Sequence, residues 1–417
     1  MMNVKKLLIL LSIVSPTFAV SCLNRGAGDP LSIPYVKGIL ADTASVEYGI
    51  VRNGCQDGRE GVISVIGPAE DAFILADGLM SCDYFDNVDG RRNPDGLPDF
   101  AGETISVVCD NANAPYGGYL DSSNEKYLRE LTVRNFISAL DTMCASSPFD
   151  MNESVHKSSS KVVILASSYS SAFGYADIRA LLDAAGPDMT VISPVHSMFS
   201  HAMDRHGENG TFAVWTTEAI LGAGVYSSVW SDVAKVCPSF KYDAFCPQVT
   251  GTLKERLLSF FRMYRSAGQK KRLDAVIVDD IPLKADSLNA ALTSMIEAAD
   301  DSIAVYRNML SDSFEFIGAA ESVASDCIKF LREKNFFTHR VAYPSMQVYE
   351  TVPVAGLPAA DYGQKGDFTE KFKYNRAENT DLETYVLVES AGGFLDDAHK
   401  EFLRRNAHKA YEQYVSK

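Results

Sequence analysis

Short apolar runs alternate with longer amphipathic stretches along most of the chain. Each run is rich in Val, Ile or aromatic residues, and most are followed by about ten or more residues with apolar positions at helical spacing. Parallel strands buried on both faces have this continuous apolar character, and crossover helices join them. Two sets of such units predict an α/β fold with two Rossmann-like parallel-sheet lobes flanking a cleft. The runs are 61–68, 104–110, 161–167, 210–216, 241–247 and 273–280.

The same pattern divides the chain into segments. Gly, Pro and other small residues between 23 and 45 indicate a tether ahead of the first strand. The near-helical spacing of apolar residues near the end predicts a C-terminal extension that ends in a helix. We predict a signal peptide over 1–21, a lipidated residue and tether over 22–60, a first lobe over 61–207 plus 300–335 with an Asp-rich insertion over 83–103, a second lobe over 208–299, and the extension over 336–417.

The first residues have the layout of a secretory signal peptide. Lys5 and Lys6 precede an apolar run that is too short to span a bilayer. The sequence AVSC that ends at Cys22 resembles a bacterial lipobox, which implies cleavage before Cys22 and its acylation, for example with palmitate. We therefore expect a lipoprotein of the cell envelope, facing the periplasm or the cell exterior. Because Leu23 follows the cysteine where some retained lipoproteins carry Asp, the outer membrane is favoured over the inner one.

Charge narrows the choice of partners. The formal net charge is −15, and removal of the signal peptide with its two lysines brings it to about −17. Binding to phosphate backbones needs clustered Lys and Arg, so nucleic acid is excluded as a partner. We expect a small carboxylate-bearing or amino-acid-like ligand, the membrane through the lipid anchor, and a protein partner through the C-terminal extension.

Candidate metal ligands do not form a recognisable motif. Apart from Cys22 the chain has seven cysteines, and none has the C-x-x-C spacing of a zinc or redox site. Some could pair in an exported protein, although an odd number leaves at least one thiol free. The Asp-rich insertion lacks the spacing of an EF-hand loop, so a solvated acidic loop is favoured over a calcium site. We expect neither a metal nor a cofactor.

Five short segments carry a family resemblance. Residues 109–132 (CDNANAPYGGYLDSSNEKYLRELT) resemble the glutamate racemase pattern GDTAxxPYGxKSxExIRELT. The strand and turn around KVVILASSY resemble the segment VIACNTA, and AVWTTEAILGAGVY resembles the element G-T-x-x-T-x-x-S-x-x-Y. FCPQV and AVIVDDIPL resemble ACPLFVP and LVLGCTHYPL. In order and spacing, about residues 61–335 are similar to the aspartate/glutamate racemase superfamily.

The catalytic positions of that family are changed in this sequence. The resemblance implies two cysteines that move the α-proton of an amino acid from opposite faces, but Ser167 and Asp280 stand at their positions. A serine without an adjacent base is a poor general base, and an unperturbed carboxylate, with a pKa of about 3.9, is a weak one. We therefore expect a pseudoenzyme that has lost two-cysteine racemisation and binds a small carboxylate-bearing ligand in the cleft.

Polar residues at the ends of the predicted strands are candidates for ligand binding. A strand-to-helix turn presents backbone N–H groups to an anion, and Ser168 and Ser170 add hydroxyl groups there. Tyr116, Gly117 and Thr217 match positions that contact substrate in the family. The same serine hydroxyls could instead cap the helix that follows.

Three other functions remain open at this point. A lyase, isomerase or hydrolase could use Asp280 as acid or base, with Ser167 orienting the substrate. A type I periplasmic-binding-protein-like receptor has a similar pair of lobes, and one architecture hosts many functions. A scaffolding protein would leave the serine-rich turn unused.

Overall fold

The computed structural model describes residues 32–87, 89–247, 250–269, 271–364, 366–380, 383–390 and 393–416. The predicted signal peptide and Cys22 lie outside these residues. Within them, no helix is long and apolar enough to cross a membrane.

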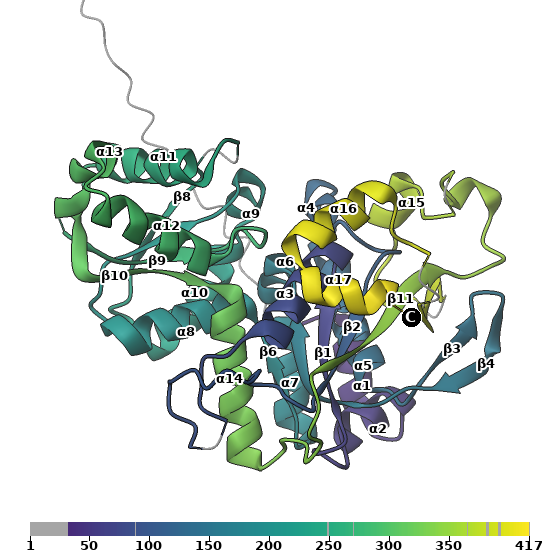
Figure 1. The fold of residues 1–417 in the computed structure, drawn as a ribbon. Coiled ribbons are helices and arrows are strands. Elements are labelled where there is room, and N and C mark those ends of the chain that lie inside the picture. The colour runs from purple at the N-terminus through teal and green to yellow at the C-terminus, as the bar shows by residue number, and fades with distance from the viewer. Residues whose placement is uncertain are drawn as a thin grey trace, which may run out of the picture.

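Two sheets organise the chain, as Figure 1 shows. The larger sheet has eight strands in the order β4-β3-β12-β11-β2-β1-β5-β6, and the smaller has four in the order β10-β9-β7-β8. All neighbours in the smaller sheet are parallel, whereas the larger sheet includes the antiparallel pairs β11–β12 and β3–β4. The predicted two-lobe α/β architecture is confirmed. The larger sheet is built from β1 (Val62–Gly67), β2 (Thr104–Cys109), β3 (Met143–Ser147), β4 (Asp150–His156), β5 (Ser160–Leu165), β6 (Thr190–Ile192), β11 (Ser345–Pro353) and β12 (Tyr385–Glu389), and the smaller from β7 (Phe212–Trp215), β8 (Tyr242–Phe245), β9 (Leu273–Val278) and β10 (Leu310–Gly318).

Helices cover both faces of each sheet. One face of the larger sheet packs against α3, α14, α16 and α17, and the other against α1, α2, α5 and α7. The smaller sheet lies between α8 and α10 on one side and α11 and α12 on the other. The helices are α1 (Pro34–Ala41), α2 (Val46–Asn53), α3 (Ala69–Ser81), α4 (Gly117–Asp121), α5 (Glu125–Leu140), α6 (Ser168–Ala172), α7 (Tyr175–Ala185), α8 (Pro194–His206), α9 (Glu218–Gly222), α10 (Val225–Val236), α11 (Leu253–Ser266), α12 (Ala285–Glu297), α13 (Asp301–Ala304), α14 (Ala319–Lys334), α15 (Glu370–Tyr374), α16 (Asp397–Asn406) and α17 (His408–Val415), with 3₁₀ turns at Arg307–Met309 and Ala359–Asp361.

The predicted tether is wrong from residue 34 to residue 53. Residues 34–53 form α1 and α2, and Val36, Ile39 and Val51 are buried against the larger lobe. Pro34 stands at the start of α1, and the hydroxyl of Ser45 accepts the N–H of Tyr48 at the start of α2. Apolar spacing and these helix-start signals outweigh the Gly and Pro content of the segment.

The lobe boundaries also differ from the prediction. Residues 310–318 form β10, which pairs with β9, so the second lobe extends beyond residue 299. The chain returns to the larger lobe through α14, which packs beside α8. Residues 345–353 and 385–389 of the C-terminal extension supply β11 and β12, two central strands of the larger sheet. The extension is therefore part of the first lobe, and the predicted final helix is divided at Ala407 into α16 and α17.

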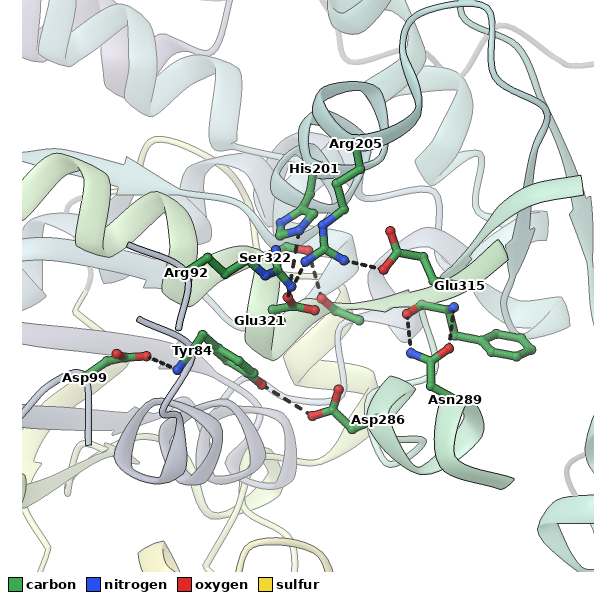
Figure 2. A network of polar contacts seen from close by, with 12 residues as sticks. Tyr84, Arg92, Asp99, His201, Arg205, Asp286, Asn289, Glu315, Glu321 and Ser322 are labelled. Carbon is green, nitrogen blue, oxygen red and sulfur yellow. Dashed lines mark hydrogen bonds and ion pairs between the residues drawn. The ribbon is translucent and has the colours of Figure 1, made fainter. Parts of the chain in front are cut away.

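The Asp-rich insertion reaches from the larger lobe to the smaller one, as Figure 2 shows. The hydroxyl of Tyr84 donates to Asp286 of α12 over 3.4 Å, and Arg92 pairs with Glu321 at the start of α14. Glu321 also accepts a hydrogen bond from Arg205 of α8 over 2.5 Å. These contacts fix the insertion to α12 of the smaller lobe and to α14, through which the chain returns to the larger lobe.

Candidate functional site

The carboxyl ends of strands from both sheets meet at one cleft of about 780 Å³. This volume lies within the range of small-molecule sites, and the carboxyl ends of parallel strands are where open α/β sheets bind ligands. Six residues that the sequence predicted for the site line this cleft. They are Tyr116, Gly117, Ser167, Ser168, Thr217 and Asp280.

The serine-rich turn after β5 places its hydroxyls in different surroundings. The Ser167 hydroxyl oxygen accepts the N–H of Tyr169 over 3.2 Å and so caps α6. The Ser168 hydroxyl donates to Oδ1 of Asp279 over 2.6 Å. Ser170 is buried and is not among the residues that line the cleft, so the structure gives no support to its predicted contact with a ligand.

The serine-rich segment itself forms a short helix, α6, which the sequence pattern did not predict. α6 ends at Ala172, and α7 begins at Tyr175. Gly174 separates the two helices with a φ of 119°, and a Cβ there would lie 2.4 Å from the side chain of Thr132. The single turn of α6 offers only a weak dipole to an anion.

Thr217 and Tyr116 have structural roles as well as positions in the cleft. The Thr217 hydroxyl caps α9 by accepting the N–H of Ile220 over 3.3 Å. The Tyr116 hydroxyl points away from the cleft and donates to Asp110 over 2.8 Å. Burial and the neighbouring Asp110 raise the pKa of Tyr116 well above its usual value, so it stays protonated. Thr217 therefore both caps α9 and lines the cleft.

The two acids after β9 point in different directions, as expected for adjacent residues at a strand end. Asp279 is buried and accepts hydrogen bonds from Ser168 and Tyr226. Asp280 lines the cleft, and its Oδ2 receives a hydrogen bond from Arg256 over 2.9 Å. Burial raises the pKa of Asp280, while the Arg256 guanidinium opposes that change. The ion pair makes Asp280 a less available base than the sequence suggests.

Asp71 is the cleft residue that the sequence reasoning missed. It belongs to the first turn of α3, directly after β1, and its side chain has no hydrogen bond or ion pair among the described residues. Burial, followed by repulsion from Glu70 and Asp279, raises its pKa to about 7. Acids in a first helical turn usually interact favourably with the helix dipole. In a sequence, such a residue therefore has an ordinary structural explanation and is not recognised as part of a site. A carboxyl group with this pKa can donate or accept a proton near neutral pH.

The lining of the cleft is acidic. Among the described residues that line it there are carboxylates and hydroxyls, but no Lys, Arg, His or Cys. The guanidinium of Arg256 does not line the cleft, and its ion pair with Asp280 links it to the cleft wall. A group with positive charge, such as an ammonium, is therefore better matched to most of this surface than an isolated anion. The acids are Asp71, Asp121, Glu218 and Asp280.

The cysteines in the described part of the chain are all free thiols. Six are buried, whereas Cys246 after β8 is half-buried. Burial and the nearby charge of Glu218 raise the pKa of Cys246. No pairing considered for an exported protein is present among these residues, and the cysteines serve as small core side chains.

The carboxylates of the Asp-rich insertion bind backbone N–H groups. Asp83 accepts hydrogen bonds from the N–H groups of Asp95 and Gly96, at 3.0 and 2.9 Å. Asp99 accepts those of Tyr84 and Phe85 in the same way. In the described residues, no group of three or more His, Cys, Asp or Glu side chains could hold a metal ion. The insertion uses its acids to fold its own loop.

Comparison with known proteins gives structural similarity alone. No protein-family model matches the chain, and no curated protein matches it. It is similar to the glutamate racemase from Francisella tularensis solved with D-glutamate, at 14% identity and a TM-score of 0.41, over 78% of this chain and 97% of that one.

Two further solved structures extend this comparison. Glutamate racemase RacE1 from Bacillus anthracis matches at 13% identity and a TM-score of 0.41, over 70% of this chain and 87% of that one. An unliganded arylmalonate decarboxylase matches at 12% identity and a TM-score of 0.33, over 65% and 92%.

Proposed function

We propose that the chain binds a small amino-acid-like molecule in the cleft between its two lobes. The observation that carries this proposal is the composition of the cleft wall. Hydroxyls at the ends of β5 and β7 lie in the same cavity as the carboxyls of Asp71, Glu218 and Asp280. A ligand with both an ammonium group and a carboxylate matches the two kinds of surface.

The charges suggest how such a ligand would be oriented. The ammonium group would face the unpaired carboxyl of Asp71, because a buried carboxylate gains most from an opposite charge. The carboxylate would face Ser167 and Thr217, whose hydroxyl oxygens accept N–H groups and whose protons remain free to point into the cleft. Of the carboxylate-bearing or amino-acid-like ligands predicted from the sequence, this arrangement favours one that carries both charged groups.

Loss of two-thiol racemisation is part of the proposal. Ser167 and Asp280 occupy the positions where the resemblance implies cysteines, and both line the cleft. Ser167 caps a helix and Asp280 is paired with Arg256. Neither side chain can therefore replace the activated thiol of a catalytic cysteine. Two-cysteine proton transfer needs a pair of matched acid and base groups, which these two side chains do not provide.

We also propose that the protein is attached to a bacterial membrane through Cys22. The apolar run and the AVSC sequence support this, and the helices from residue 34 onward leave about a dozen residues between the anchor and the folded body. A receptor or carrier of the cell envelope would then present its cleft near the membrane surface. A protein partner through the C-terminal extension remains part of the same hypothesis.

A second candidate function is acid–base catalysis by Asp71. Its pKa of about 7 gives it the proton affinity that a general acid or base needs near neutral pH. Asp280, which the sequence favoured for this role, is held by Arg256. An isomerase or lyase reaction at a carbon next to the ammonium group would use Asp71 as its proton carrier.

Ligand-observed NMR in D2O would test both candidates. The chain without its first 21 residues and with Cys22→Ser is mixed with the D- and L-forms of glutamate, aspartate and lysine. Saturation transfer to any of them without loss of the α-proton signal supports binding alone. Loss of that signal supports catalysis, provided that Asp71→Asn abolishes it.

Asp188→Asn is a suitable control, because Asp188 is exposed, pairs with Lys334 and does not line the cleft. Its binding and exchange should equal those of the unsubstituted protein. Absence of transfer from the whole panel would contradict the amino-acid proposal.

A further inference from the structure

One wall of the cleft is a turn that follows β2. Residues 113–118 run from the end of this turn into α4, and Pro115, Tyr116, Gly117 and Gly118 line the cleft. On the side of the turn away from the cleft lies α15 of the C-terminal extension, more than 250 residues later in the chain. The two segments are in direct contact through polar groups.

Lys373 makes the shorter of the two contacts from α15. Its ammonium group donates to the backbone oxygen of Ala114 over 2.6 Å, and the side chain is buried. Tyr374, the next residue, donates its hydroxyl to the backbone oxygen of Pro115 over 3.1 Å. Two successive carbonyl groups of the turn are therefore held by two successive side chains of α15. A hydrogen bond from a charged donor is about twice as strong as a neutral one.

Arg376 holds the two ends of the turn. Its Nη2 atom donates to Oδ1 of Asn113 over 2.5 Å and to the hydroxyl of Tyr119 over 2.7 Å. The guanidinium also lies 4.9 Å from the ring centre of Tyr127 and 4.8 Å from that of Phe368. These two aromatic rings help to fix the position of the guanidinium.

Gly118 shows how closely the two segments approach. A Cβ atom at this position would lie 2.2 Å from Cζ of Tyr374. The wall of the cleft and α15 are consequently packed without space between them. A movement of α15 would have to move the turn, or leave buried carbonyl groups of the turn without donors.

We propose that Lys373 and Arg376 are positioning residues that set the shape of the cleft and so determine which ligands fit. Neither lines the cleft; both act through the turn at 113–118. The extension, which has the place of an addition to the racemase-like part of the sequence, would then be a specificity element of the binding site. The part of this inference that concerns ligands rests on the proposed function.

Hydrogen exchange provides the first test, because it needs no ligand. Lys373→Met keeps the length of the side chain and removes the donor to Ala114. The matched control is Lys371→Met, since Lys371 is exposed on the same short helix. We expect amide exchange in peptides that cover 113–121 to rise about tenfold in Lys373→Met and to be unchanged in Lys371→Met.

Exchange in β9 of the other lobe reports whether the variant is folded, and it should be the same in all three proteins. If Lys373→Met does not fold, Tyr374→Phe removes only the hydroxyl that contacts Pro115 and should give a smaller rise in the same peptides. Equal exchange of 113–121 in the variants and the unsubstituted protein would overturn the positioning role.

The second test measures affinity for D-glutamate. The dissociation constant should rise at least about fivefold in Lys373→Met and stay within about twofold in Lys371→Met. If the unsubstituted protein binds D-glutamate and both variants bind it equally, the specificity role is wrong although the proposed function stands. If the unsubstituted protein does not bind D-glutamate, the choice of ligand is wrong, and the exchange result still decides whether Lys373 positions the turn.

Discussion

The hydroxyl of Ser168 donates to Oδ1 of Asp279 over 2.6 Å, and this bond joins the two lobes at the base of the cleft. Ser168 begins α6 after β5 of the larger sheet, whereas Asp279 follows β9 of the smaller one. Tyr226 donates to the other oxygen of the same carboxylate. Asp279 thus receives donors from both lobes, and its neighbour Asp280 is left to face the cleft.

Replacement of Ser168 by Ala should destabilise the protein in a pH-dependent way. Asp279 is buried, and burial raises its pKa, while the bonds from Ser168 and Tyr226 oppose the change. Without Ser168 the folded pKa rises further above the unfolded one, so the ionised form at higher pH is disfavoured more strongly. We expect the free energy of unfolding to fall by about 1 to 3 kcal/mol at pH 8 and by less at pH 4.

Urea denaturation at the two pH values would measure this difference. Ser170→Ala is the matched control, because Ser170 is buried in the same short helix outside the cleft. Its effect should be small and independent of pH. An equal loss of unfolding free energy for both variants at both pH values would mean that the hydrogen bond to Asp279 does not stabilise the contact between the lobes.

Asp71→Asn should stabilise the protein above neutral pH. The pKa of Asp71 is raised to about 7 in the folded state, chiefly by burial, and lies near 3.9 in an unfolded chain. Between these values the unfolded state binds fewer protons, so the stability of the unsubstituted protein falls as pH rises through that window. Removal of the charge should raise the free energy of unfolding by about 1 to 3 kcal/mol at pH 8, and the gain should disappear below about pH 4.

Thermal unfolding of both proteins across pH 4 to 9 would follow this gain. A raised carboxyl pKa could also be observed directly by carbon NMR of labelled Asp side chains. A gain that does not vary with pH would show that Asp71 titrates normally, and it would remove the basis for the catalytic candidate.

Much of the fold follows from the sequence because its central strands are buried on both faces. β1, β5 and β9 are mostly apolar, and every residue of β1 and β5 is buried. β10 was missed, since Asp312 and Glu315 interrupt its apolar pattern at the edge of the smaller sheet. β11 and β12 lie in the larger sheet beside strands more than 200 residues earlier. The local spacing of apolar residues does not indicate which distant strands pair.

The site was predictable to a similar degree. Ser167, Thr217 and Asp280 were singled out because they match positions of the family that the sequence resembles. Each is the second residue after a strand, and these strand ends meet at one cleft. Asp71 was missed because an acid in a first helical turn has an ordinary structural explanation. Lys373 and Arg376 could not have been found, since their role depends on a contact with a turn that lies far away in the sequence.

Arg256→Met should destabilise the protein more than removal of an exposed lysine from the same helix. Arg256 and Asp280 are both largely buried and form an ion pair at 2.9 Å. Without the guanidinium the pKa of Asp280, already raised by burial, rises further. We expect a loss of about 2 kcal/mol in the free energy of unfolding at pH 8, because removing one partner leaves a carboxylate without its opposite charge.

Lys254→Met is the control on α11, since Lys254 pairs with Asp300 at the surface. Exposed pairs contribute little to stability, so its melting temperature should hardly change. Equal melting temperatures for the two variants would indicate that Asp280 is protonated in the folded protein and does not need Arg256. In that case Asp280 would again be a candidate acid in the cleft.

Thiol labelling under native conditions should select Cys246. Cys246 is half-buried, whereas the other cysteines in the described residues are buried. Burial and the negative charge of Glu218 raise its pKa, so labelling by iodoacetamide should be slow at pH 7 and accelerate as the pH rises toward 9. Mass spectrometry of the Cys22→Ser chain should find one modified site before unfolding and all of them afterwards. Because the charge of Glu218 contributes to the raised pKa of Cys246, Glu218→Gln should increase the labelling rate at pH 7. An unchanged rate in Glu218→Gln would show that burial alone controls this thiol.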